Sequence, residues 1–282
     1  MNGFSEEWLR LREPADAAAR NPEIASGLAA HLAGRTKAAF VDLGCGAGAN
    51  LRHTALLLPR DMRQCWRLLD HDPRLLLSAR VRLTDWADKF SEAPSGALQL
   101  EKDGREIEAS FCEADLNGNI ERFLHLDEIV TASAFFDLVS RDWIARFAKG
   151  AVALGAAVYA PLIYNGIQIW SPPHPADLPM LVAFNAHQRR DKGLGTAAGP
   201  SAAAALHDVL CERKYTVTRG DSSWRLGPQN ANLIAMLAET SAAAVAELGF
   251  FDEQAIAKWK ESRLGAASCL IGHTDILALP AA

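Results

Sequence analysis

One short stretch constrains the fold of this chain more than any other: an apolar segment that runs directly into a glycine-rich turn. The apolar segment covers residues 38–43, and Gly44, Gly46 and Gly48 follow before a helix-like segment that opens near Asn50. Glycines let the backbone turn tightly and let a ligand approach without a Cβ in the way. The helix that follows would point free N–H groups and a positive dipole end at a carboxylate or phosphate. The stretch therefore predicts a buried strand, a ligand-binding turn and a helix, in that order.

Strand-like and helix-like segments alternate along the rest of the chain, which indicates an α/β fold with a mostly parallel sheet and helices on both faces. Asp103-Gly104 and Asn165-Gly166 each predict a hairpin turn. We expect residues 1–37 to form a helical N-terminal extension, broken at Asn21-Pro22, and residues 38–282 to form one domain with a substrate-side insertion around 161–200. Further strands are expected at 65–70, 98–101, 106–114, 128–134, 151–164, 167–170, 214–219 and 268–278.

Composition argues against several classes of function. The formal net charge of −5 disfavours a general nucleic-acid binder, which needs a basic face. The alanine-rich runs are too short and interrupted to span a bilayer, and residues 1–7 lack the features of a signal peptide. Five scattered cysteines without a C-x-x-C pair, and eight histidines without an H-E-x-x-H pair, predict neither disulfides nor a metal site. We therefore expect a cytoplasmic protein with no metal, no membrane and no nucleic-acid partner.

The glycine-rich stretch resembles motif I of class I S-adenosylmethionine-dependent methyltransferases, whose signature reads roughly V-x-D-x-G-x-G-x-G. Asp42, two residues before the first glycine, belongs to that signature. Gly44, Gly46 and Ala49 formally satisfy the dinucleotide pattern G-x-G-x-x-G/A as well, so an NAD(P)-dependent oxidoreductase is an alternative. The resemblance continues in register at the ends of three further strands, in residues 68–73, 112–116 and 129–138. Open α/β sheets bind ligands at that edge.

The resemblance implies a Rossmann-like methyltransferase fold with a seven-stranded sheet, and a role toward S-adenosylmethionine for each motif residue. The glycines and Cys45 would contact the methionine moiety, with Asp42 near its amino group. Asp70 would accept hydrogen bonds from the ribose hydroxyls, with Asp72 as a second choice. Asp115 and the Leu116 backbone would hold the adenine edge. The cofactor-binding set implied by the motifs is Asp42, Gly44, Cys45, Gly46, Gly48, Asn50, Asp70, His71, Asp115, Leu116 and Ser133.

Three polar residues outside the strand ends have two interpretations each. Arg12 and Arg20 on the N-terminal extension could bind the cofactor's carboxylate, as in methyltransferases whose N-terminal helix covers the cofactor. Alternatively, Arg12, Asp16 and Arg20 form a ladder along one helix face. Asn50 could reach the same carboxylate or could cap the start of its helix.

The sequence defines the residues that would bind the methyl acceptor less clearly than those that would bind the cofactor. Asp137, just after the fourth motif, and His187 are the candidate acid–base residues, because a methyl acceptor that must lose a proton needs a base. Asp137 could instead cap the next helix, and the polar stretch around His187 could be a solvated helix end. Trp224 could wall a substrate pocket. The predicted substrate-binding residues are Phe136, Tyr164, Trp170, Arg189, Arg190 and Lys192.

These observations predict an S-adenosylmethionine-dependent methyltransferase that acts on a small molecule, as a monomer or homodimer. The basic residues Arg189, Arg190 and Lys192 suggest an acidic acceptor, which favours O-methylation of a carboxylate or hydroxyl over N-methylation. A protein that binds S-adenosylmethionine without catalysis is a further alternative. Ser171-Pro172-Pro173-His174 is similar to a motif of amino-directed nucleic-acid methyltransferases, but it does not directly follow the fourth strand and lacks the aromatic residue, so we expect a proline-rich turn.

Overall fold

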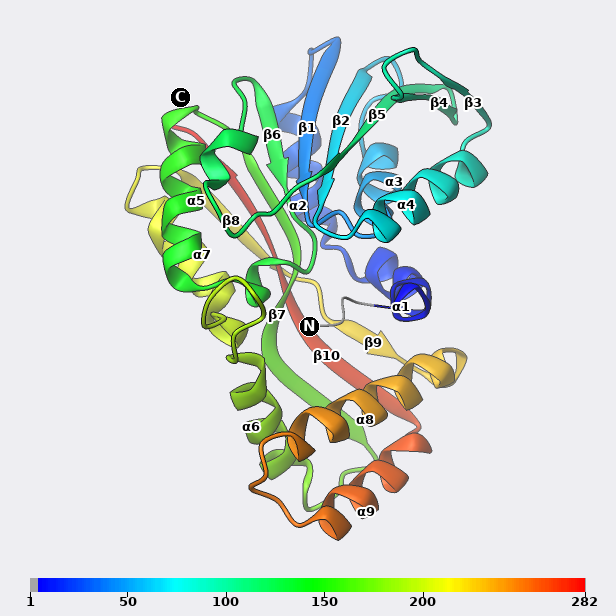
Figure 1. The fold of residues 1–282 in the computed structure, drawn as a ribbon, viewed down its shortest axis with the longest axis vertical. Coiled ribbons are helices and arrows are strands. Elements are labelled where there is room, and N and C mark those ends of the chain that lie inside the picture. Colours follow the sequence, from blue (N-terminus) through cyan, green and yellow to red (C-terminus); the bar gives the residue numbers. More distant parts are fainter. Residues whose placement is uncertain (1–4, 282) are drawn as a thin grey trace.

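The computed structural model describes residues 5–281, and these residues form an α/β protein around one sheet of ten strands (Figure 1). The strand order is β3-β4-β5-β2-β1-β6-β7-β10-β8, and β9 pairs with β10. Five neighbouring strands run parallel and form the centre of the sheet, so the predicted α/β class is confirmed. They are β5 (Arg105–Glu113), β2 (Arg63–Asp70), β1 (Lys37–Leu43), β6 (Glu128–Thr131) and β7 (Val158–Ser171).

Antiparallel strands extend the sheet at both edges. On one side are β3 (Lys89–Glu92) and β4 (Leu98–Lys102), and on the other β10 (Ser268–Leu279), β8 (Thr216–Asp221) and β9 (Trp224–Leu226). The sheet is therefore larger than the seven strands expected. The four residues of β3 are all exposed and so show no alternation, and the three residues of β9 are too few for their alternation to identify a strand in sequence.

Helices cover both faces of the parallel centre. The inner faces of α2 (Pro22–His31), α3 (Ala49–Leu57) and α4 (Pro73–Trp86) pack in one core with Phe40 and Trp66, whose rings stack at 4.2 Å. On the other face, α5 (Arg141–Ala153) and α7 (Ala202–Cys211) pack against Val41 and Val130. Adjacent residues of β1 thus point to opposite cores, as period-two geometry requires. Short 3₁₀ helices lie at Ile120–Phe123, Phe136–Leu138, Gly199–Ser201 and Pro228–Asn230.

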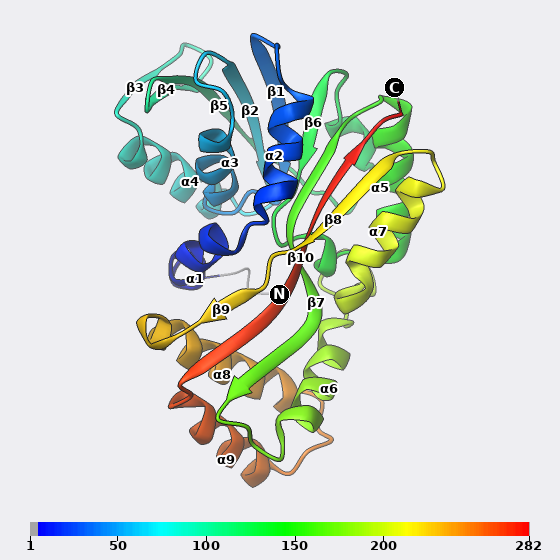
Figure 2. The ribbon, with the colours of Figure 1, turned by 180° about the vertical axis from the view of Figure 1, so that it is seen from behind.

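Beyond the parallel centre, β7 and β10 continue together as a long two-stranded ribbon. Three helices pack on one face of this ribbon, namely α6 (Asp177–Gln188), α8 (Ala231–Ala246) and α9 (Glu253–Leu264), while Figure 2 shows its other face from behind. We call this part, with β9, the lower lobe. It combines the expected insertion around 161–200 with residues 224–271, which are distant in sequence. Within residues 5–281, no helix has the length and apolar character needed to cross a membrane.

The strand predicted at 151–164 begins only at Val158, and the predicted hairpin at Asn165-Gly166 is wrong. Helix α5 continues to Ala153, and β7 is one uninterrupted strand from Val158 to Ser171. Gly166 has a φ of 91°, but it lies in a bulge, not in a reversing turn. Tyr164 pairs with His273 and Gln168 with Ile271, so three residues of β7 face a single residue of β10. The chain does not fold back here because β10 already pairs with β7 on both sides of the bulge.

Candidate functional site

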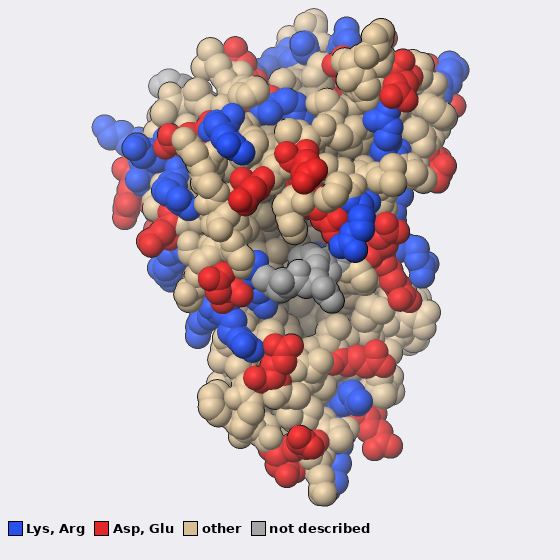
Figure 3. Space-filling view, in the orientation of Figure 1, with Lys and Arg blue, Asp and Glu red and all other residues tan. Residues whose placement is uncertain are grey.

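Two adjoining cavities lie at the carboxyl ends of the parallel strands, between these ends and the lower lobe. The first has a volume of about 350 Å³ and the second about 140 Å³, and they share the lining residues Arg12, Ala134, Leu138 and Gln188. Acidic and basic side chains are interspersed over the face that Figure 3 shows. The first cavity is lined by Leu9, Arg12, Glu13, Asp16, Gly44, Cys45, Gly46, Ala47, Ala49, Asn50, Asp70, His71, Leu75, Arg82, Ser133, Ala134, Phe135, Leu138, Gln188, Lys192 and Leu194.

The glycine-rich turn forms one wall of the first cavity. Gly44 and Gly46 have φ values of 64° and 52°, a region that side chains disfavour. A Cβ on Gly44 would lie 2.6 Å from the Phe135 ring, so the close packing of the turn requires glycine there. Cys45 N–H donates to the Leu69 carbonyl at 2.9 Å, which fixes the turn against the end of β2.

Asp70, the last residue of β2, lies beside this turn and lines the first cavity. Its Oδ2 accepts from Gly46 N–H at 2.8 Å and its Oδ1 from Asp72 N–H at 3.0 Å. The neighbouring His71 also lines the cavity. Asp72 does not line it, because its carboxylate caps α4 and pairs with Arg74 at 2.7 Å. Of the two aspartates proposed for the ribose, only Asp70 has its carboxylate at the cavity.

Asp42, near the end of β1, is fully buried and is hydrogen-bonded to Asn50 in the first turn of α3. The Asn50 amide donates to Asp42 Oδ1 at 2.7 Å and to Thr131 Oγ1 at 2.9 Å. Burial raises the pKa of Asp42 to about 7. Arg20 donates to Asn50 Oδ1 at 2.9 Å and to the Thr54 hydroxyl at 3.1 Å. Asn50 does not cap α3, since Gly48 occupies that position, and Arg20 is occupied by protein oxygens instead of facing the cavity.

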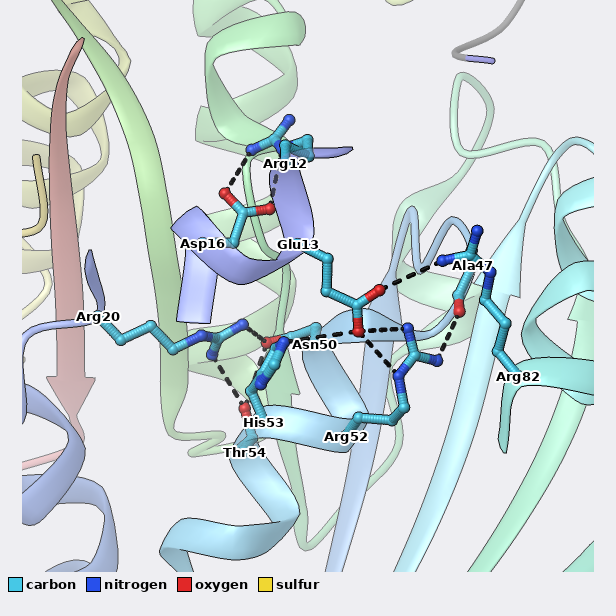
Figure 4. Close-up of polar contacts among 10 residues, drawn as sticks. All are labelled: Arg12, Glu13, Asp16, Arg20, Ala47, Asn50, Arg52, His53, Thr54 and Arg82. Atoms are coloured by element: carbon cyan, nitrogen blue, oxygen red, sulfur yellow. Dashed lines mark hydrogen bonds and ion pairs between the residues drawn. The ribbon is translucent and has the colours of Figure 1, made fainter. Parts of the chain in front are cut away.

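Helix α1 (Glu6–Ala19) covers the first cavity and is held there by ion pairs (Figure 4). Glu13 accepts from Arg52 Nη2 at 2.6 Å and Nε at 2.9 Å, and from Arg82 at 3.2 Å. Arg52 also donates to the Ala47 carbonyl at 2.9 Å. A single arginine therefore joins the covering helix to the glycine-rich turn.

Arg12 lies where the two cavities meet. Its guanidinium pairs with the Asp16 carboxylate through both oxygens, at 2.8 and 3.1 Å, and lies 5.1 Å from the Trp224 ring. The Trp224 indole N–H donates to the same carboxylate at 3.0 Å. The helix-ladder interpretation therefore holds for Arg12 and Asp16, but Arg20, its third member, turns to Asn50 instead.

Asp137 lines the second cavity and is half-buried, with its Oδ1 atom shielded from solvent. Burial raises the pKa of Asp137 to about 6, and its Oδ1 has no hydrogen-bond partner among the described residues. Ser140, not Asp137, caps α5 by accepting from Trp143 N–H. Tyr164 donates to Asn185 Oδ1 at 2.9 Å. The second cavity is lined by Trp8, Arg12, Ala134, Asp137, Leu138, Leu162, Tyr164, Gln168, Phe184, Gln188, Trp224, Leu237, Ile271 and His273.

Comparison with known proteins supports the fold. No protein-family model and no curated protein matches the chain. Among solved structures it is similar to a cyclopropane-fatty-acyl-phospholipid synthase-like protein from Lactobacillus casei, at 13% identity over 98% of this chain and 95% of that chain, with a TM-score of 0.51. The chain has the class I methyltransferase fold.

Two other structures cover nearly the whole chain at lower TM-scores. The YcgJ protein from Bacillus subtilis matches at 10% identity over 93% of this chain and 100% of that chain, with a TM-score of 0.48. Magnesium protoporphyrin IX methyltransferase from Synechocystis, solved with bound S-adenosylhomocysteine, matches at 10% identity over 100% of this chain and 90% of that chain, with a TM-score of 0.44. The fold similarity rests on the structure from Lactobacillus casei alone.

Within this methyltransferase fold, several predicted residues lie away from both cavities. Phe136 is in the core and Trp170 packs against Trp259. Asp115 is exposed, the Leu116 carbonyl accepts from the Trp143 indole at 2.7 Å, and Gly48 begins α3. None of these five residues lines either cavity.

His187 and the basic residues at the end of α6 do not line the second cavity. His187 and Arg190 both bind Glu247 of α8, at 3.0 and 3.1 Å. Of the three basic residues of this stretch, Arg189 lines a separate outer recess and only Lys192 lines the first cavity. The location of His187 therefore argues against a role as acid–base residue.

Sequence reasoning missed several residues of the second cavity, among them Trp8, Gln168 and His273. Burial lowers the pKa of His273 to about 3, so its imidazole is neutral at physiological pH. A signal was present for this residue, because His273 and Asp275 interrupt an otherwise apolar strand. Buried polar residues of that kind need partners or a function.

Proposed function

We propose that the protein transfers a methyl group from S-adenosylmethionine to a small-molecule acceptor. The observation that carries the proposal is the convergence of three motif segments on one cavity: Gly44 and Gly46 after β1, Asp70 at the end of β2, and Ser133 after β6. A second, smaller cavity adjoins it through four shared residues. Two connected compartments suit a donor and an acceptor that must meet end to end.

The residues of the first cavity suit the parts of S-adenosylmethionine. Asp70 offers a carboxylate to a vicinal diol. A Cβ at Gly46 would have Leu9 Cδ1 as its nearest neighbour, at 3.5 Å, so the bare backbone leaves room for a ligand to approach closely. Lys192 lines the cavity and forms no ion pair within residues 5–281, so it is our candidate for the methionine carboxylate in place of Arg12 and Arg20. When bound, the cofactor supplies an electrophilic methyl group on a sulfonium sulfur.

The protein's own residues would orient the acceptor, exclude water and handle a proton. Trp8 of α1 and Trp224 of β9 line one side of the second cavity, with their ring centroids 6.4 Å apart. Asp137 lies in this cavity with a raised pKa, which suits a group that takes a proton near neutral pH. The sequence-based preference for an acidic acceptor loses its basis, because Arg189, Arg190 and Lys192 do not line the second cavity.

Calorimetric titration with S-adenosylhomocysteine and with NADH tests the proposal. We expect micromolar binding of S-adenosylhomocysteine and none of NADH. The reverse result would favour an oxidoreductase and overturn the proposal. Binding of S-adenosylhomocysteine without methyl transfer to any amine, alcohol or carboxylate of a broad panel would favour a non-catalytic binding protein.

A further inference from the structure

The second cavity contains one ionisable side chain whose charge is not balanced. Its lining residues within 5–281 include Arg12, Asp137 and His273. Arg12 is already paired with both oxygens of Asp16. His273 is uncharged, because burial and the nearby Arg12 lower its pKa to about 3. Asp137 forms no ion pair among the described residues: Arg12 and, from the first cavity, Lys192 act on it only at longer range, so its carboxylate is left without a direct counter-ion.

One oxygen of the same carboxylate is left without a hydrogen bond. Asp137 Oδ1 is buried and lacks a hydrogen-bond partner within residues 5–281. An ionised carboxylate can only accept hydrogen bonds, and a buried acceptor without a donor is costly. A ligand that brings an N–H or O–H group to this oxygen would remove that cost.

The remaining walls are mostly aromatic and aliphatic. Trp8, Trp224, Tyr164 and Phe184 line the cavity, and the last two rings contact edge to face at 6.0 Å. Its volume of about 140 Å³ resembles that of an apolar cavity of about 150 Å³ that holds benzene. The shape therefore accommodates an apolar body of about one ring.

We propose that the second cavity binds a small amine with an apolar body the size of one aromatic ring, and that Asp137 Oδ1 accepts a hydrogen bond from its ammonium group. This inference rests on the proposed function, since it assigns the amine as the methyl acceptor. A carboxylate ligand would face the like charge of Asp137, and an alcohol would leave that charge unbalanced.

The same pairing gives Asp137 a defined proton to take. An ammonium nitrogen has no free electron pair and cannot accept a methyl group. Transfer of one N–H proton to the Asp137 carboxylate leaves a neutral amine with its lone pair on nitrogen and a neutral carboxylic acid. The unsatisfied carboxylate of the second cavity thus becomes both the binding group and the proton acceptor for the amine.

Three ring-sized probes that differ in charge test the inference: benzylamine, benzyl alcohol and benzoate. Each is titrated calorimetrically into the protein in the presence of saturating S-adenosylhomocysteine. We expect benzylamine to bind at least tenfold more tightly than benzyl alcohol, as a charge-assisted hydrogen bond implies, and benzoate not to bind. Asp137→Asn, which is nearly isosteric, should weaken benzylamine about tenfold and leave benzyl alcohol within twofold.

Asp208→Asn provides the matched control, because it removes one exposed carboxylate on α7 far from the cavity lining; it should leave all three affinities unchanged. Benzoate binding as tightly as benzylamine to the unmodified protein would overturn the inference, and so would an Asp137→Asn variant with full affinity for benzylamine. The comparison of benzoate with benzylamine needs only the unmodified protein, so it can be made even if Asp137→Asn does not fold. Binding of S-adenosylhomocysteine is measured separately, so failure of the proposed function is distinguished from failure of the amine assignment.

Discussion

Glu13 of α1 and Arg52 of α3 form a two-point ion pair, with Glu13 Oε1 accepting from Nη2 at 2.6 Å and from Nε at 2.9 Å. The Arg52 side chain is 6% exposed and that of Glu13 20%. Because Arg52 also donates to the Ala47 carbonyl, the pair joins the helix that covers the first cavity to the turn that forms its wall. Cofactor binding and the position of α1 should therefore depend on the same carboxylate.

Glu13→Gln should lower both the stability of the protein and its affinity for the cofactor. The substitution leaves the buried Arg52 guanidinium without its counter-ion, which costs about 2 kcal/mol in the free energy of unfolding. A loosened α1 should also lower the affinity for S-adenosylhomocysteine about tenfold. Urea unfolding and calorimetry measure the two effects. Glu7→Gln removes an exposed carboxylate from the same helix and should change neither, so equal effects of both variants would refute the assigned role.

Asp70→Asn and Asp72→Asn separate the two aspartates considered for the ribose. Asp70 lines the first cavity, and its variant should bind S-adenosylhomocysteine at least tenfold more weakly, because one carboxylate oxygen becomes a donor. Asp72 caps α4, a task that asparagine also performs, so its variant should keep its affinity within twofold. Calorimetry on both variants measures the difference. The opposite order would assign the ribose contact to Asp72.

The motif residues at the strand ends were predictable because their positions follow from local sequence and parallel pairing. Strand β1 ends at Leu43, so its turn at Gly44 must lie near Asp70 at the end of the neighbouring β2, since parallel strands finish at one edge. The turn needs positive φ values that glycine supplies, and no distant contact is required to specify them.

The acceptor cavity was not predictable in the same way, because distant segments build it. Whether Asn165-Gly166 forms a hairpin or a bulge depends on pairing with β10, about a hundred residues later. The sequence alone was compatible with a catalytic role for His187. In the structure its Nε2 lies 3.0 Å from the carboxylate of Glu247, at the C-terminal end of α8. Local sequence patterns carry no information on either contact, and the same holds for Trp8, which α1 brings to the cavity.

Asp42→Asn should change the pH dependence of stability. Burial raises the pKa of Asp42 to about 7, above its ordinary value of 3.8. The folded state therefore binds more protons than the unfolded state between about pH 4 and 7, and the Asp42 contribution to stability falls as pH rises through that window, by up to about 1.4 kcal/mol per pH unit. Asparagine does not titrate, so the stability of the variant relative to the unmodified protein should increase from pH 4 to pH 7.

Urea unfolding at pH 4.5, 5.5, 6.5 and 7.5 measures that difference. Comparison at each pH cancels the contributions of His53 and His273, whose lowered pKa values act in the opposite direction. Asp61→Asn, at an exposed position, sets the baseline for removing one carboxylate. A difference that stays constant with pH would show that Asp42 is ionised in the folded protein throughout this range.

Asp137→Asn should abolish the rise of the methyl-transfer rate with pH. Burial raises the pKa of Asp137 to about 6, and only its ionised form can take a proton. With benzylamine as the acceptor, kcat/KM, which reports the pKa of the free enzyme, should therefore rise about tenfold per pH unit below pH 6 and level off above it. The variant should turn over about a hundredfold more slowly and lack this rise, while its affinity for S-adenosylhomocysteine stays within twofold, because Asp137 does not line the first cavity. Methyl transfer measured from pH 5 to pH 8 on both proteins tests this, and a rise near pH 6 that persists in the variant would assign the titration to another group.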